Sequence, residues 1–114
     1  MLHHLTLGHL DVTAVRERRA VVVRPLDMGV VGRLLGELGG VDDRGPPTLG
    51  GGSVEVGDGY VMVPWLMPYP VPEAVEFARR LHEETGCLMA DLGRRELVTR
   101  ERFEREAAAT PNGF

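Results

Sequence analysis

The sequence predicts one α+β domain over residues 1–110, with a mainly antiparallel sheet, two helices on one face and a tail over residues 111–114. Three observations lead to this fold class. From residue 20 onward the hydrophobic patterns run strand, helix, strand, strand, helix, strand, which is the ferredoxin-like βαββαβ order. Asp58-Gly59 separates two strand patterns and is typical of a hairpin turn. Residues 20–23 and 60–63 are apolar on both faces, as interior strands are.

An extra N-terminal strand is predicted before this core pattern. We expect residues 10–15 to form a strand that turns at residues 16–19 into the central strand 20–23, which Pro25 ends. This hairpin would compete with the strand at residues 87–90 for one edge of the sheet. The sequence therefore leaves the position of the N-terminal strand open.

The first long helix is predicted to begin at Asp27, whose carboxylate can cap the first turn, and to end at Gly39-Gly40. An apolar stripe of Met28, Val31, Leu35 and Leu38 faces the core. The opposite stripe carries glycines, each of which costs about 0.5–1 kcal/mol relative to alanine. Either a second copy's helix packs closely on this face, or an exposed surface tolerates the glycines. The residues of this candidate dimer face are Gly29, Gly32 and Gly36.

Residues 41–52 are a loop by composition, and their glycines lack the Gly-Lys-Ser/Thr pattern of a phosphate-binding loop. Residues 53–56 then form the outer arm of the hairpin and residues 60–63 the inner arm. Pro64 has no backbone N–H, so pairing on one side of the inner arm is expected to stop near it.

A proline-rich crossover follows and carries the candidate binding residues Trp65, Met67 and Tyr69. A rigid segment presents aromatic rings at low entropic cost, as binding hot spots do. The same rings also suit a plug at the bottom of the core, and both alternatives stay open. The helix at residues 73–85, with Gly86 as a left-handed cap, is the clearest amphipathic pattern.

The C-terminal part predicts a strand at residues 87–90, a short return at residues 96–98 and a short helix capped by Thr99. Phe103 and Ala107 are the apolar residues of this helix, so we expect it to be only lightly docked.

Composition limits the functional classes. The net charge of −4 argues against a nucleic-acid binder, which usually has a basic face. No apolar run is long enough for a membrane span and no signal peptide is present, so a cytoplasmic location is expected. A single cysteine fits a reducing compartment. All thirteen basic residues are arginine, which indicates a GC-rich and hence bacterial genome.

The sequence predicts no catalytic motif, no metal site and no cofactor. His3 and His4 are adjacent in a strand pattern, so their rings point to opposite faces and do not share an ion. The best acid–base pair on offer is weak: His82 near a helix end and Asp91 at a strand end.

We therefore expect a non-enzymatic protein-interaction module, homodimeric and serving a protein partner as an accessory, immunity or antitoxin-like protein does. The alternative is a small-ligand sensing domain with a pocket between sheet and loop. A metal-dependent or His/Asp-dependent enzyme is the weaker third hypothesis.

Overall fold

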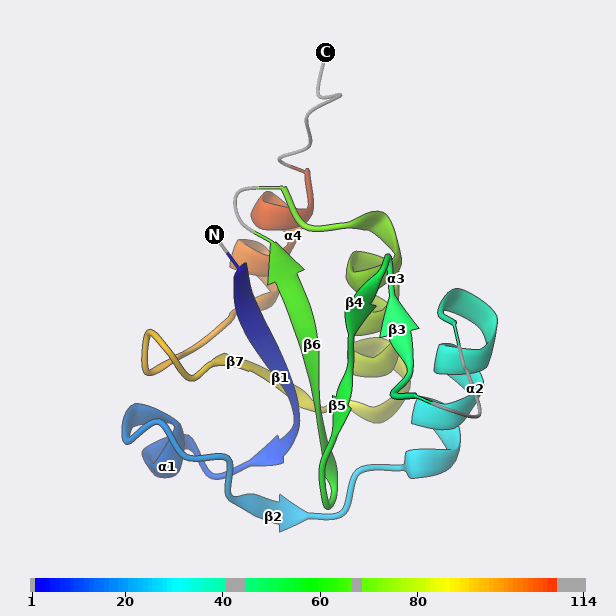
Figure 1. The fold of residues 1–114 in the computed structure, drawn as a ribbon. Coiled ribbons are helices and arrows are strands. Elements are labelled where there is room, and N and C mark those ends of the chain that lie inside the picture. Colours follow the sequence, from blue (N-terminus) through cyan, green and yellow to red (C-terminus); the bar gives the residue numbers. More distant parts are fainter. Residues whose placement is uncertain (1, 41–44, 67–68, 109–114) are drawn as a thin grey trace.

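The computed structural model describes residues 2–40, 45–66 and 69–108. They form a mixed α+β domain with an antiparallel sheet and, within these ranges, four helices (Figure 1). In chain order the elements are β1 (Leu2–Leu10), α1 (Val12–Arg16), β2 (Val22–Arg24), α2 (Met28–Leu38), β3 (Thr48–Leu49), β4 (Gly52–Ser53), β5 (Glu55–Val56), β6 (Tyr60–Leu66), α3 (Pro72–Thr85), β7 (Leu88–Asp91), β8 (Glu96–Leu97) and α4 (Arg100–Ala108).

The N-terminal strand β1 is the centre of the sheet, which runs β5-β6-β1-β7-β8. It pairs antiparallel with β6, where Leu5 lies opposite Val63, and with β7, where Leu7 lies opposite Met89. The prediction that residues 20–23 form the central strand was wrong. β2 pairs only with His9 and Leu10 at the end of β1, with a register shift between these two residues, and Val23 is 66% exposed. The valines of β2 favour an extended backbone, but the nine-residue β1 is long enough to pair with β6 on one edge and with β7 on the other.

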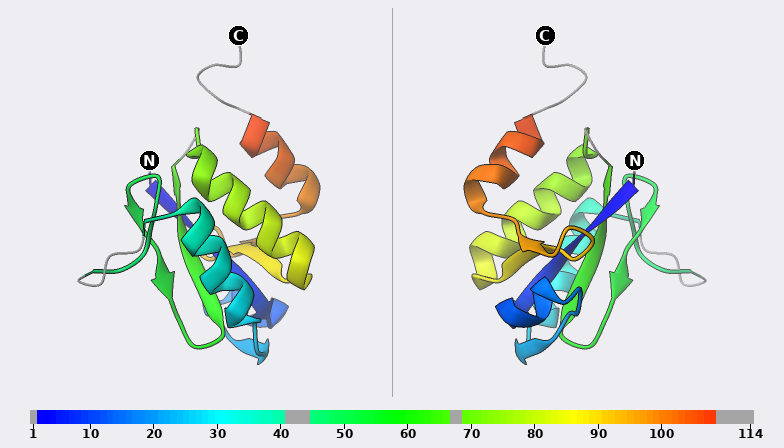
Figure 2. Two further views of the ribbon diagram at one scale, coloured as in Figure 1. Left: turned by 90° about the vertical axis from the view of Figure 1, so that its right-hand side faces the viewer. Right: turned by 90° about the vertical axis from the view of Figure 1, so that its left-hand side faces the viewer.

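Residues 12–16 form α1 instead of the expected strand. The Asp11 carboxylate caps this helix by accepting a hydrogen bond from the Thr13 N–H at 3.1 Å. Val15 of α1 is buried and packs with Leu10 and Ala90 in a second apolar cluster. Figure 2 shows α1 on the side of the sheet away from α2 and α3. α1 therefore covers part of the sheet face that α2 and α3 leave open.

The main core lies between the sheet and the two longer helices, α2 and α3 (Figure 2). α2 begins as predicted. The Asp27 carboxylate accepts hydrogen bonds from the backbone N–H groups of Gly29 at 3.0 Å and Val30 at 3.3 Å. Met28 is exposed rather than part of the buried stripe. α2 ends at Gly39, whose φ of −115° is not left-handed. A Cβ there would lie 2.2 Å from the Thr48 carbonyl oxygen, so this glycine is required by the close approach of β3.

The β5–β6 hairpin at Asp58-Gly59 is confirmed, with Gly59 at a φ of 85°. β5 pairs with β6 only as far as Met62, whereas β1 continues to Leu66, so pairing on one side does stop before Pro64. The interpretation of residues 41–52 as a loop was partly wrong. Residues 48–53 form the β3–β4 hairpin, in which Leu49 is fully buried; residues 41–44 lie outside the described ranges.

α4 docks firmly on α3, contrary to expectation. Phe103 is fully buried and stacks on Trp65, with ring centroids 5.6 Å apart. The Arg79 guanidinium lies 5.7 Å from the Phe103 ring centroid and donates to Glu104 at 3.1 Å. One aromatic anchor together with an ion pair therefore replaces the wide apolar stripe that the sequence lacks. The helix at residues 73–85, the Gly86 cap and the return at β8 are confirmed.

Ion pairs also join the outer surfaces of the helices. Arg80 of α3 binds Glu37 of α2 at 2.8 Å, and Glu76 binds Arg79 within α3 at 3.2 Å. Further pairs join Arg33 to Glu84 and Arg100 to Glu83. The arginines of the helix layer are thus largely neutralised by neighbouring acids.

Candidate functional site

Of the three candidate binding residues, Trp65 lies in the core and is 4% exposed. Its stacking on Phe103 agrees with the core-plug alternative rather than with a recognition surface. Tyr69 is 49% exposed, and Met67 lies outside the described residues. Tyr69 is therefore the ring of this segment that a ligand or partner can reach.

The three glycines of the candidate dimer face are exposed on the outer surface of α2. A Cβ added at Gly32 or Gly36 would meet no atom within 4 Å, so no described residue packs on this part of the helix. A Cβ at Gly29 would lie 3.1 Å from the Asp27 carboxylate. The dimer face stays a prediction.

His82 and Asp91 are not brought together. His82 Nδ1 lies 2.7 Å from the Cys87 carbonyl oxygen, at the start of the strand segment. Asp91 is at the other end of β7, roughly 13 Å further at about 3.3 Å per residue. Its carboxylate accepts from the Arg94 N–H at 3.1 Å, which is a turn-stabilising role. The two side chains therefore do not form an acid–base pair.

The described residues also contain no group of three or more His, Cys, Asp or Glu side chains arranged to hold a metal ion. His3 and His4 pair with Trp65 and Pro64 in the β1–β6 ladder and so point to opposite faces of the sheet. Cys87 is buried, and burial raises the pKa of its thiol, which makes it an unreactive core residue.

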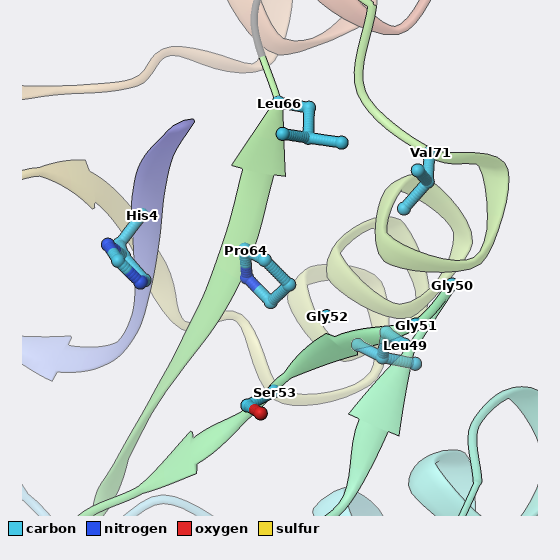
Figure 3. Close-up of a pocket in the computed structure, with 9 residues that line it drawn as sticks. All are labelled: His4, Leu49, Gly50, Gly51, Gly52, Ser53, Pro64, Leu66 and Val71. Carbon is cyan, nitrogen blue, oxygen red and sulfur yellow. The ribbon is translucent and has the colours of Figure 1, made fainter. Parts of the chain in front are cut away.

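The site that the structure does form is a hollow of about 460 Å³ beside β6, which we call the β6 hollow (Figure 3). It lies between the sheet, the β3–β4 hairpin and the start of α3. Its lining residues are His4, Leu49, Gly50, Gly51, Gly52, Ser53, Pro64, Leu66 and Val71. Figure 3 shows His4 on β1 and Ser53 on β4, with Pro64 between them.

Two glycine contacts build this hollow. Where β5 stops pairing, the β3–β4 hairpin leaves the plane of the sheet and packs beside Pro64. A Cβ at Gly52 would lie 2.6 Å from Pro64 Cγ, so only glycine allows this contact. Gly50, at a φ of 57°, fits against Val71 in the same way, with 2.7 Å from an added Cβ to Cγ2. The glycine run thus allows close packing, a role that composition alone does not reveal.

The lining of the β6 hollow combines apolar and polar side chains. Leu49, Pro64, Leu66 and Val71 make its lining mostly apolar, and the side chains of His4 and Ser53 add polar groups. No acidic residue lines it, and no hydrogen bond joins His4 to Ser53 in the described structure. Its described lining residues therefore include neither a hydrogen-bonded nucleophile and base nor a carboxylate.

Comparison with known proteins found no family model, no curated protein and no solved structure that matches this chain. Among the described residues, none of the helices combines the length and the apolar character that crossing a bilayer requires.

Proposed function

We propose that the protein is a non-enzymatic binding domain that takes a small, largely apolar molecule in the β6 hollow. The observation that carries this proposal is the hollow itself. Its volume of about 460 Å³ falls in the range of roughly 300–1,000 Å³ that is typical of small-molecule sites. Such sites combine an apolar lining with a few polar groups that orient the ligand.

The walls of the hollow are closely packed in the structure without a ligand. Gly50 and Gly52 hold the hairpin against Val71 and Pro64, and Leu49 anchors its other strand in the core. A site that is already formed loses little conformational entropy on binding, so more of the contact energy appears as affinity. The ligand's apolar body would lie on Pro64, Leu66 and Val71, and one polar group would reach His4 or Ser53.

Blocking the hollow tests the proposal. Ser53 is exposed and lines the hollow, so Ser53→Phe should fill it without removing a core contact. Glu55→Phe adds the same ring two residues along the chain, outside the lining, and is the matched control. The probes are a library of small aromatic and short aliphatic fragments, followed by ligand-observed NMR and by thermal shift.

We expect fragments that bind the natural chain and Glu55→Phe but are lost with Ser53→Phe. A fragment at 100 times its dissociation constant should add about 2.7 kcal/mol of stability. Fragments that bind Ser53→Phe equally well, or a library without a binder at millimolar concentration, would contradict the proposed site.

We retain the protein-interaction module as the second candidate function, in the form of a homodimer through the glycine face of α2. The open space over Gly32 and Gly36 supports it, because helices approach closely where side chains are absent. Size-exclusion chromatography with light scattering, on the natural chain and on Gly32→Leu, tests the dimer. A monomer at high concentration, or a dimer that Gly32→Leu leaves intact, counts against this face.

We also propose that the fold is an expanded ferredoxin-like sheet, in which β1 takes the place that we had predicted for residues 20–23. The order β5-β6-β1-β7, with each neighbouring pair antiparallel, supports this assignment. NMR contacts between the backbones of Leu5 and Val63 and of Leu7 and Met89 test it. Their absence would remove β1 from the centre.

A further inference from the structure

We propose that the hollow between α1 and β8 is a docking site for an acidic peptide segment of a protein partner, in which an apolar residue stands beside the acid. We call it the arginine hollow. Its volume is about 180 Å³, and its lining residues are Val12, Val15, Arg16, Arg95, Glu96 and Leu97. It lies on the side of the sheet away from α2 and α3 (Figure 2) and shares no lining residue with the β6 hollow.

The two arginines of this hollow differ from most arginines of the helix layer. Arg16 and Arg95 are exposed, and neither forms an ion pair with any acid in the described residues. The one carboxylate in the lining, Glu96, is held by Arg102 of α4 at 2.6 Å. Both guanidinium groups therefore keep their full charge and their hydrogen-bonding capacity for an external anion.

Neighbouring charges strengthen the local positive field. Arg18 follows Arg16 in the turn after α1 and is likewise without an acidic partner among the described side chains. Arg19 is paired with Glu17 at 2.9 Å, so that nearby acid is already occupied. Because the whole chain carries a net charge of −4, an acidic partner is repelled by most of the surface. The arginine hollow thus orients the approach of such a partner.

The apolar residues of the arginine hollow account for the apolar residue that we propose beside the acid of the partner. Val15 is fully buried and Val12 is 40% exposed, and with Leu97 they place a partly accessible apolar surface between the charges. Such a surface suits one aliphatic side chain beside a carboxylate. Nucleic acid fits less well, because affinity for a phosphate backbone comes from many basic contacts along a groove, usually with aromatic stacking.

The probe for the test is the capped peptide acetyl-Glu-Leu-Glu-Leu-Glu-Leu-amide, titrated into the full chain at low salt and followed by backbone NMR. The comparison ligands are the lysine counterpart, in which each Glu is replaced by Lys, and a single-stranded oligonucleotide of equal charge. The variants are the double substitution Arg16→Gln with Arg95→Gln, and Arg105→Gln as the matched control. Arg105 is an exposed arginine of α4 that also has no ion pair in the described residues.

We expect the acidic peptide to shift the resonances of Arg16, Arg95 and Leu97, and the double variant to bind about tenfold or more weakly. Arg105→Gln should bind as the natural chain does, and added salt should weaken binding. An unchanged melting temperature of the double variant separates lost binding from lost folding. No shifts at millimolar peptide, equal binding by the double variant, or tighter binding of the oligonucleotide or the lysine peptide would overturn the proposal.

Discussion

Replacing Phe103 by alanine is predicted to destabilise the whole domain, because this residue carries the docking of α4. Its side chain is fully buried, its ring lies 5.6 Å from that of Trp65, and Arg79 lies 5.7 Å from its centroid. Removal of a buried phenylalanine costs about 3–5 kcal/mol. The lost aromatic pair accounts for about 0.5–1.5 kcal/mol of this cost. We therefore expect the free energy of unfolding to fall by about 4 kcal/mol.

Urea unfolding followed by tryptophan fluorescence measures this effect. Trp65 is the single tryptophan of the chain, so its emission reports directly on the contact that is removed. With a slope of about 2 kcal/mol per molar urea, the midpoint should fall by about 2 M. The emission of folded Phe103→Ala should also move to longer wavelength, because the indole loses one of its covering surfaces.

Two further variants make the result interpretable. Phe103→Leu keeps most of the buried volume and should cost less than alanine does. Arg105→Ala changes an exposed residue of the same helix and should stay within about 0.5 kcal/mol of the natural chain. If Phe103→Ala costs less than about 1 kcal/mol and leaves the Trp65 emission unchanged, α4 is a lightly held appendage and the argument for its docking fails.

The close packing of the hairpin and the partial burial of His9 lead to two more predictions. Gly52→Ala should destabilise the chain by about 1–3 kcal/mol in the same urea assay, because its Cβ would lie 2.6 Å from Pro64 Cγ. Gly36→Ala has open space at its Cβ and should stabilise the chain by about 0.5–1 kcal/mol. Equal effects of the two substitutions would refute the packing role of Gly52. Burial, and then the nearby Arg24, lower the pKa of His9 below its ordinary 6.5, so the unfolded chain binds the proton more readily. The free energy of unfolding should therefore fall as the pH drops from about 6.5 through the folded pKa of His9. His9→Gln should remove this contribution to the pH dependence. If urea unfolding between pH 5 and pH 8 shows the same pH dependence for His9→Gln and the natural chain, the prediction is wrong.

Local sequence patterns predicted those features whose causes lie within one or two turns of chain. Asp27 caps α2, Thr99 caps α4 and Gly86 ends α3, because each acts on amides or carbonyls a few residues away. The Asp58-Gly59 turn likewise sets its own hairpin. Only one feature of the β6 hollow was predicted from the sequence. Pairing of β6 with β5 stops before Pro64, whereas pairing with β1 continues to Leu66.

Only the tertiary structure decided which strand is central and where a ligand can bind. Residues 20–23 have the side chains of an interior strand, yet β1 takes the centre because its length satisfies the edges of both β6 and β7. The β6 hollow depends on contacts of Gly50 and Gly52 with Val71 and Pro64, which lie at least a dozen residues further along the chain. The amino-acid sequence by itself therefore determined the helix caps, the β5–β6 turn and the three longer helices, but not α1 or the β3–β4 hairpin. Strand order and surface shape followed from competition between distant segments for the same partners, which no local pattern records.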